Sequence, residues 1–219
     1  FLGIWVVRCL GPEQFGLFSY AHSFVCLFTA IATLGLDSIV VRELVKDESR
    51  RDEIIGTAFW LKIMGAVGVL LLLAIAVNFI SNDIHTNTLV FIIASATIFQ
   101  SFNVVDMYFQ SKVMSRYVVY ANIISLSISS IVKIVLILND ATLVAFAWVV
   151  LFDSIVLSIG FIYFYINSNL SLKVWRFNFK LSRKLLKSSY PLIFSSLFIS
   201  IYMKIDQVMI GEYLGVYSV

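Results

Sequence analysis

Polar and charged residues recur at helical spacing inside long apolar stretches of this 219-residue chain. Within residues 89–109, Gln100, Asn103 and Asp106 are three positions apart, so they share one face of a helix. Two similar stripes lie within 117–138 and 188–210. They consist of Asn122, Ser125, Ser129 and Lys133, and of Ser189, Ser196, Ser200, Lys204 and Gln207, with Asp206 beside the second. These faces favour a polar cavity, although rows of serine are also typical of close helix packing.

Asp153 is the hardest of these residues to explain as a surface residue, because it lies near the middle of the apolar stretch 142–166. A charge at that depth in a membrane helix costs at least about 2.5–3.5 kcal/mol on insertion. We therefore expect Asp153 to face a water-filled cavity or a partner cation.

The other charged residues within the apolar stretches lie closer to the ends of those stretches. Lys133 and Lys204 either line the polar cavity or extend to the membrane surface, where long basic side chains keep their charge in water. Lys62 is the residue that we most expect at that surface. Asp106 is one turn from a helix end, so it either joins the cavity or solvates that end.

The sequence holds no recognisable catalytic, cofactor-binding or metal-binding constellation. It lacks the GxxxxGK[ST] phosphate loop, and no Ser/His/Asp or Cys/His set can be assembled from it. His22 and His85 have no second ligand at metal spacing, and Cys9 and Cys26 are interpreted as free buried thiols. Transport is therefore favoured over enzymatic activity.

The elements that must position these side chains are membrane-spanning helices. Hydrophobic residues make up 60% of the chain and charged residues 13%, and the mean hydropathy is +0.95. A soluble domain of this size cannot bury so much apolar surface. The apolar stretches hold 21 to 27 residues each, which is enough to span a bilayer as helices. They cover 15–36, 54–80, 89–109, 117–138, 142–166 and 188–210.

These stretches predict an all-α polytopic bundle of six complete helices. Residues 1–7 read as the tail of a further, truncated helix, so we expect the chain to be an internal fragment of a longer membrane protein. Basic residues exceed acidic ones by three, but they gather in short segments between the apolar stretches. Nucleic-acid binding is therefore not expected.

The basic residues of the connecting segments fall almost entirely on one side of the predicted bundle. One set of alternate segments contains twelve Lys and Arg, and the other contains only Arg8. The first set comprises 37–53, 110–116 and 167–187, and the second comprises 8–14, 81–88, 139–141 and 211–219. Because basic loops stay in the cytoplasm, the first set and the N-terminal side of the chain are predicted to be cytoplasmic.

The most basic segment, 167–187, is the best candidate for a linker between two units. From Lys173 onward its basic residues fall on one side of a helix, which indicates a basic amphipathic helix on an anionic leaflet. Trp175, Phe177 and Phe179 alternate, so the first part is equally compatible with an extended chain. Simple orientation of the protein by positive charge remains a third interpretation.

Two sequence runs resemble a known family. RCLGPEQFGLFSYAHSF (8–24), followed by LGLDSIVVRELVK (34–46), is similar to the start of the polysaccharide and O-antigen flippases. These belong to the multidrug/oligosaccharidyl-lipid/polysaccharide exporter superfamily. LLKSSYPLIFSSLFISIYMKIDQVMIGEYLG (185–215) resembles the seventh helix of that family, with Pro191 near its start and Asp206 near its end.

The resemblance implies two MATE-like lobes of six helices around a central cavity, of which this chain covers about the first half. Residues 1–166 would form the N-lobe, 167–187 the inter-lobe linker and 188–219 the first helix of the second lobe. The implied cargo is an undecaprenyl-diphosphate-linked sugar repeat unit in the bacterial inner membrane, and the polysaccharide polymerase and chain-length machinery are possible partners. Lys133 and Lys204 would attract the diphosphate, and Asp153 would pair with a lysine or bind a coupling proton.

Two other functions remain open on the sequence. A multidrug/cation antiporter of the same superfamily would favour acidic residues in the cavity, whereas sugar-lipid transport needs cations there. A membrane glycosyltransferase or polymerase would need a catalytic constellation. A purely structural membrane protein would not need repeated polar stripes.

Overall fold

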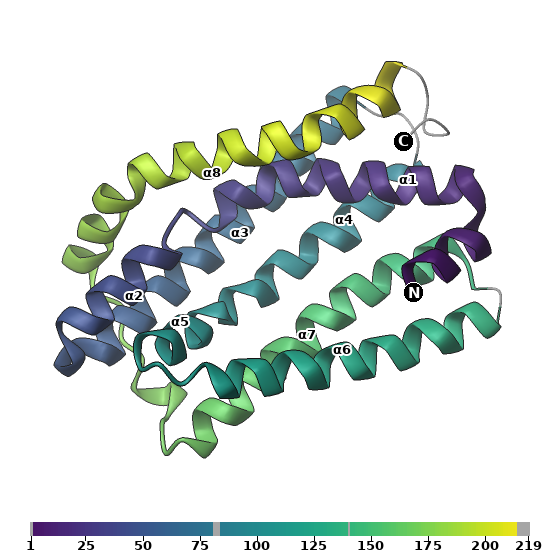
Figure 1. The fold of residues 1–219 in the computed structure, drawn as a ribbon. Helices are drawn as coiled ribbons and strands as arrows, with labels where there is room; N and C mark the ends of the chain where they lie inside the picture. Colours follow the sequence, from purple (N-terminus) through teal and green to yellow (C-terminus); the bar gives the residue numbers. More distant parts are fainter. Residues whose placement is uncertain (1, 81–83, 140, 214–219) are drawn as a thin grey trace.

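The computed structural model describes residues 2–80, 84–139 and 141–213, and the secondary structure of these residues is helical without strands. Long helices lie side by side and reverse direction from one to the next (Figure 1). They are α1 (Leu2–Ala32), α3 (Arg51–Ile80), α4 (Ile84–Phe99), α6 (Ser115–Leu138), α7 (Leu143–Asn167) and α8 (Phe179–Tyr213). Shorter helices are α2 (Asp37–Lys46) and α5 (Val104–Ser111), with 3₁₀ turns at Glu48–Arg50, Gln100–Asn103 and Leu172–Val174.

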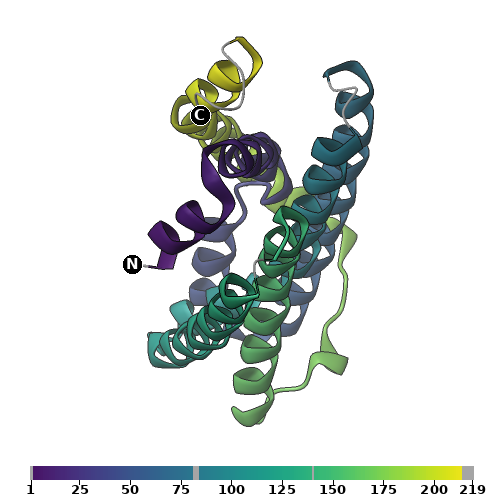
Figure 2. The ribbon, with the colours of Figure 1, turned by 90° about the vertical axis from the view of Figure 1, so that its right-hand side faces the viewer.

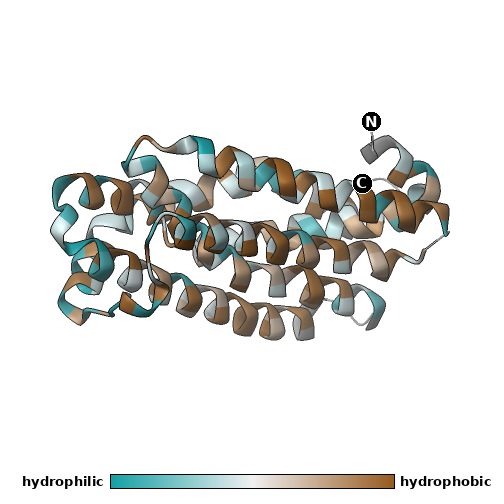
Figure 3. Cartoon of the chain, turned by 90° about the horizontal axis from the view of Figure 1, so that it is seen from below, coloured by the Kyte–Doolittle hydropathy of each residue, from teal (hydrophilic) through white to brown (hydrophobic). Residues whose placement is uncertain are grey.

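Five helical segments of the described chain are long and apolar enough to cross a membrane. They are Glu48–Val77, His85–Ser111, Ser115–Leu138, Leu143–Asn167 and Phe179–Ile210. Apolar residues run along the middle of the bundle, and hydrophilic residues gather most densely at the end that carries α2 (Figure 3). The chain is therefore a multi-pass helical bundle, as predicted, although α1 is not among these five segments.

The helices are arranged so that α6 and α8 lie at opposite edges of the bundle. α8 packs along α1, α1 contacts α3 and α4, α4 contacts α7, and α7 pairs with α6 (Figures 1 and 2). One apolar core lies where α2, α3, α5 and α7 meet, around Val40, Ile55, Phe109 and Tyr165. The other lies between α1, α3 and α4, around Phe24, Leu73 and Val90.

Several segments that were expected to be loops are helical. Residues 8–14 belong to α1 and are interrupted only at Gly11, whose φ of +75° suits a residue without a side chain. Pro12 follows directly and begins the second half of the helix, a position that suits its fixed φ. Residues 37–46 form α2, whose apolar side chains Ile39, Val40 and Leu44 are buried, and this amphipathic face explains why the charged segment folds.

The predicted linker consists of three conformations. A 3₁₀ turn at Leu172–Val174 leads into residues 175–178, which are not helical and begin with an extended Trp175, and α8 begins at Phe179. Asn178 caps α8, because its Oδ1 accepts hydrogen bonds from the backbone N–H groups of Lys180 and Leu181 at 2.9 and 3.2 Å. A continuous amphipathic helix from Lys173 is therefore wrong, and the extended alternative is confirmed at Trp175 but not at Phe179, which is helical. The division into lobes remains a prediction.

The end of the bundle opposite α2 lies partly outside the described residues. Of the expected loop 81–88, residues 84–88 are already helical, and 81–83 are outside the described range. The same applies to residue 140 in the expected loop 139–141, and to 214–219 in the final segment.

Candidate functional site

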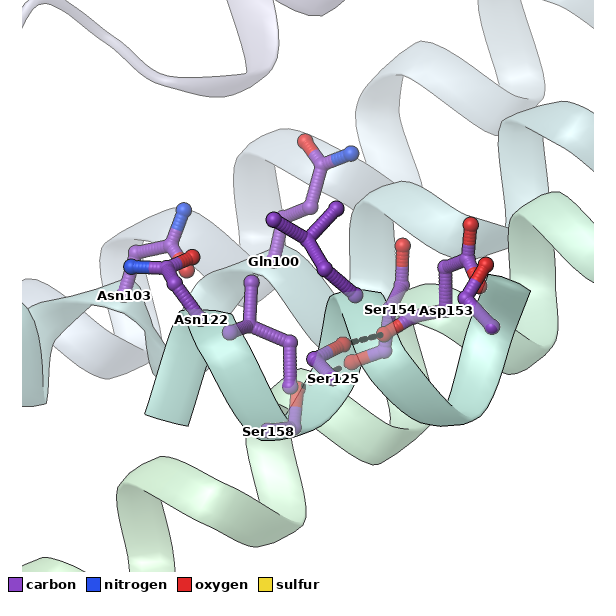
Figure 4. Close-up of a pocket in the computed structure, with 10 residues that line it drawn as sticks. Gln100, Asn103, Asn122, Ser125, Asp153, Ser154 and Ser158 are labelled. Carbon is purple, nitrogen blue, oxygen red and sulfur yellow. Dashed lines mark hydrogen bonds between the residues drawn. The ribbon is translucent and has the colours of Figure 1, made fainter. Parts of the chain in front are cut away.

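A polar cavity of about 280 Å³ lies between the 3₁₀ turn at Gln100–Asn103 and the helices α6 and α7. Figure 4 shows Gln100 and Asn103 facing Asn122 and Ser125 of α6, with Asp153, Ser154 and Ser158 contributed by α7. Ser129, Leu126 and Leu157 complete the lining. The polar faces predicted within 89–109 and 117–138 therefore meet in this cavity, and Asp153 joins them there.

A break in the predicted helix 89–109 contains two of the side chains that line the cavity, Gln100 and Asn103. The expected helix 89–109 is divided into α4, a 3₁₀ turn at Gln100–Asn103, and α5. Ser158 of α7 donates a hydrogen bond to the carbonyl oxygen of Phe99 at 2.8 Å, at the last residue before the turn. The Ser158 hydroxyl also lies 2.7 Å from the carbonyl oxygen of Ser154 in its own helix, so its single hydrogen is shared between α7 and the break.

Asp153 forms an ion pair inside the bundle. The Lys133 Nζ atom of α6 lies 3.1 Å from Asp153 Oδ2 of α7, and about one third of each side chain is exposed. The Oδ1 atom of Asp153 is buried without a hydrogen-bond partner, and so is Ser129 Oγ. Asp153 thus has the partner cation that its depth in the helix led us to expect, and it keeps one carboxylate oxygen free to accept a proton or a hydrogen bond.

Lys62 does not lie at the surface, which corrects our expectation. Its side chain is only 5% exposed, and its Nζ atom lies 2.7 Å from Asp37 Oδ1 at the start of α2. A buried ammonium group needs a charged partner, and Asp37 becomes available because residues 37–46 fold as a helix beside α3.

The Asp37–Lys62 pair lines a second, smaller cavity of about 40 Å³. Gln100 and Asn103 line both cavities, so the two ion pairs lie on either side of the 3₁₀ turn. Asp106 lines neither of these two cavities and accepts a hydrogen bond from Gln110 Nε2 at 3.0 Å. The alternative in which Asp106 solvates a helix end fits this contact better than a place in the larger cavity.

The polar stripe of α8 lies in a different place from the other two. Ser189 is fully buried and Ser196, Ser200 and Lys204 are half-buried, on the side of α8 that packs against the bundle. Lys204 lines a cavity of about 120 Å³ together with Ser19, His22 and Ser23 of α1. Asp206 is exposed and outside this lining, and the Gln207 side chain lies outside the described part of the chain.

Sequence reasoning did not assign His22 to a site. The sequence does contain a pattern that would have indicated this site, because Ser19, His22 and Ser23 follow the i, i+3, i+4 spacing of one helix face. The His22 Nδ1 atom lies 3.8 Å from Cys26 Sγ, one turn further along α1. Among the described residues, no group of three His, Cys, Asp or Glu is placed to hold a metal ion.

Fold and site together define a multi-pass helical membrane protein with charged and polar groups inside its bundle. A family model described as polysaccharide biosynthesis protein matches residues 3–219. The chain belongs to this family. No curated protein and no solved structure matches the chain.

Proposed function

We propose that this chain belongs to a flippase that moves undecaprenyl-diphosphate-linked O-antigen or polysaccharide repeat units across the bacterial inner membrane. The direction is from the cytoplasmic to the periplasmic leaflet. The observation that carries the proposal is the polar cavity between the 3₁₀ turn at Gln100–Asn103, α6 and α7, in a member of a polysaccharide biosynthesis family. A transporter needs such a cavity, whereas a purely structural bundle would leave its polar groups without a purpose.

The chemistry of the cargo matches the lining. The polyprenyl tail can remain in the bilayer while the sugar head and the diphosphate cross it. The amides of Gln100, Asn103 and Asn122, together with four serine hydroxyls, can replace the hydrogen bonds that the sugars lose with water. This replacement lowers the cost of desolvating the head group.

The cations have distinct tasks in this mechanism. Lys133 is held by Asp153, so protonation of Asp153 would release the ammonium group to attract a diphosphate. Asp153 thus couples proton binding to cargo binding. Lys204 offers a second positive charge on α8, which opens the second lobe in the proposed architecture, and His22 of α1 faces the same cavity.

An experiment on O-antigen display tests this function. Asp153→Ala and Lys204→Ala are made in the protein expressed from its complete open reading frame, in cells that lack their own flippase. Both variants should insert normally, because removal of a charge eases insertion, and display should fall. A desolvated charge contact contributes about 2–5 kcal/mol, which corresponds to a loss of roughly thirty- to several-thousand-fold in affinity.

Two further variants control this experiment. Lys204→Arg should be milder than Lys204→Ala, because it keeps the charge. Ser127→Ala changes an exposed serine of α6 that lines neither the cavity beside Asp153 nor the cavity beside Lys204, and it should leave display intact. Protein levels are compared by immunoblot. Normal display from both alanine variants at normal expression would remove Asp153 and Lys204 from the mechanism.

The proposed orientation rests on the uneven distribution of Lys and Arg and is tested separately. Cysteines introduced into loop 81–88 should react with an impermeant thiol reagent from the periplasmic side. Reaction of cysteines in 167–187 from that side would reverse the orientation.

The cation-antiporter alternative is less well supported. Export of a cationic drug favours an unpaired acid in the cavity, and Asp153 is already neutralised by Lys133. Interaction with the polysaccharide polymerase and the chain-length machinery remains a prediction of the family resemblance.

A further inference from the structure

The segment 173–187, which we call the basic strap, carries more positive charges than there are carboxylates beside it. All six of its basic residues are exposed. They are Lys173, Arg176, Lys180, Arg183, Lys184 and Lys187. The strap connects α7 with the membrane-crossing part of α8, so it lies at the level of the lipid headgroups at the end of the bundle that carries α2 (Figure 1).

Three neighbouring basic residues differ because each has a carboxylate of its own. Arg50 contacts Glu53, Arg51 contacts Asp52, and Lys112 contacts Glu48. Arg42 and Lys46 lie 3.8 and 3.9 Å from Glu43. The same carboxylate contacts Lys184, whose Nζ atom lies 2.6 Å from Glu43 Oε2. This is the one ion pair of the strap among the described residues. Five positive charges of the strap therefore have no described carboxylate within ion-pair distance.

The backbone of the strap is fixed in place against α3. The Arg176 N–H donates to the carbonyl oxygen of Asp52 at 3.3 Å, and the Asn178 N–H donates to Thr57 Oγ1 at 3.1 Å. Gly56 makes this contact possible, because a Cβ atom there would lie 2.6 Å from the Arg176 nitrogen. Leu181 and Leu185 anchor the helical part in the apolar core. The charges are thus presented from a preformed scaffold, which reduces the entropy cost of binding.

Apolar side chains accompany the charges. Val174, Phe177 and Phe179 are 43%, 46% and 75% exposed. Basic groups beside exposed aromatic groups are typical of protein surfaces that enter the interfacial layer of a membrane. The surface therefore matches a ligand that offers negative phosphates above an apolar layer.

We propose that the basic strap binds the anionic headgroups of the membrane leaflet at this end of the bundle, with phosphatidylglycerol and cardiolipin as its lipid class. The unpaired charges contact the phosphates, and the exposed apolar residues enter the layer beneath them. This surface is distinct from the cavities beside Asp153 and Lys204, and its lipid binding does not depend on the flippase activity.

The test measures the affinity of the purified protein, expressed from its complete open reading frame, for phosphatidylglycerol and for phosphatidylcholine. The lipids are titrated in detergent, and binding is followed by the shift in thermal unfolding temperature. The triple variant Lys180→Gln/Arg183→Gln/Lys187→Gln should bind phosphatidylglycerol at least about tenfold more weakly, because each basic residue contributes several-fold to affinity near an anionic surface. Phosphatidylcholine binding should not change.

A matched control removes three charges from paired residues at the same end of the bundle. Arg50→Gln/Arg51→Gln/Lys112→Gln, in which each residue has a carboxylate of its own, should retain most of the affinity for phosphatidylglycerol. Equal losses in the two triple variants, or a wild-type protein that binds both lipids alike, would overturn the proposal. Binding of an acidic peptide in preference to phosphatidylglycerol would also overturn it, because the partner would then be a protein.

Gly56→Ala tests the preformed scaffold without changing any charge. The added methyl group should displace residues 175–178 and weaken phosphatidylglycerol binding, while the expressed protein level stays normal. If this variant does not fold, the salt dependence of the wild-type protein decides the question. Affinity for phosphatidylglycerol should fall steeply with salt, and a salt-independent affinity would contradict the proposal.

Discussion

Lys133 of α6 and Asp153 of α7 form an ion pair whose nitrogen and oxygen atoms lie 3.1 Å apart beside the polar cavity. Because the cavity is surrounded by apolar helices, each partner would be costly without the other. The pair therefore serves as a structural link between the two helices.

A double-mutant cycle measures the strength of this link. Lys133→Gln and Asp153→Asn should each lower the free energy of unfolding in detergent, because each leaves one charge unpaired inside the bundle. The double variant should recover part of the loss and give a coupling energy of about 1–3 kcal/mol. Additive effects of the two single variants would show that the ion pair does not contribute to stability.

The Asp37–Lys62 pair should respond asymmetrically to substitution. Lys62 is buried, whereas 60% of the Asp37 side chain is exposed. Asp37→Ala leaves a buried ammonium group without its partner and should lower the free energy of unfolding by about 1–3 kcal/mol. This range is smaller than for a fully buried pair because the carboxylate is exposed to water. Lys62→Met removes the buried charge and fills a similar volume, so its cost should be smaller. Thermal unfolding of the two variants tests the order, and a larger loss in Lys62→Met would contradict it.

Ser158 should be more important for stability than its small size suggests. It is buried and donates to the Phe99 carbonyl at the break between α4 and the 3₁₀ turn. Ser158→Ala removes this contact between α7 and the break and should destabilise the protein by about 0.5–1.5 kcal/mol. Ser154→Ala is the control, because its hydroxyl bonds only within α7, to Val150 at 3.3 Å. Equal effects of the two variants would show that the contact at the break is unimportant.

The sequence was sufficient to predict which helix faces are polar. Asn122 and Ser125 share a face because the α-helix repeats every 3.6 residues. Gln100 and Asn103 share one because the 3₁₀ turn that contains them repeats every three residues. The two faces then meet because buried polar groups avoid lipid. Hydropathy alone also located five of the six predicted membrane-crossing segments, since each must satisfy its own backbone hydrogen bonds, and 15–36 is the one outside the five.

The contacts between distant segments could not be predicted from the sequence. The break after Phe99 has no proline or glycine to announce it, and its contact with Ser158 comes from a residue 59 positions away. Lys62 was expected at the surface because it lies near the end of its apolar stretch, but its position depends on the fold of residues 37–46. Lys204 is near α1 rather than near Asp153 because α8 packs on that side of the bundle.

Stability at acidic pH should depend on the contact between α2 and α8. A hydrogen bond from Lys184 holds the pKa of Glu43 below its usual value, and nearby Lys46 and Arg42 act in the same direction. In the unfolded chain the pKa of a glutamate is about 4.3. Because the folded-state pKa is the lower one, the unfolded state binds the proton first as the pH falls. The stabilisation is therefore complete above the unfolded pKa and is lost as the pH falls through the folded pKa.

The unfolding temperature, measured from pH 7 downward, tests this linkage. The wild-type protein should lose stability from about pH 5 downward, around the unfolded glutamate pKa. Lys184→Gln should lower the unfolding temperature at pH 7 and flatten the acid-dependent loss, because Glu43 then keeps only its weaker contacts with Arg42 and Lys46. Lys187→Gln is the matched control, since Lys187 forms no ion pair with a described residue, and its pH profile should follow the wild type. A pH profile of Lys184→Gln identical to that of the wild type would show that this contact does not set the acid stability.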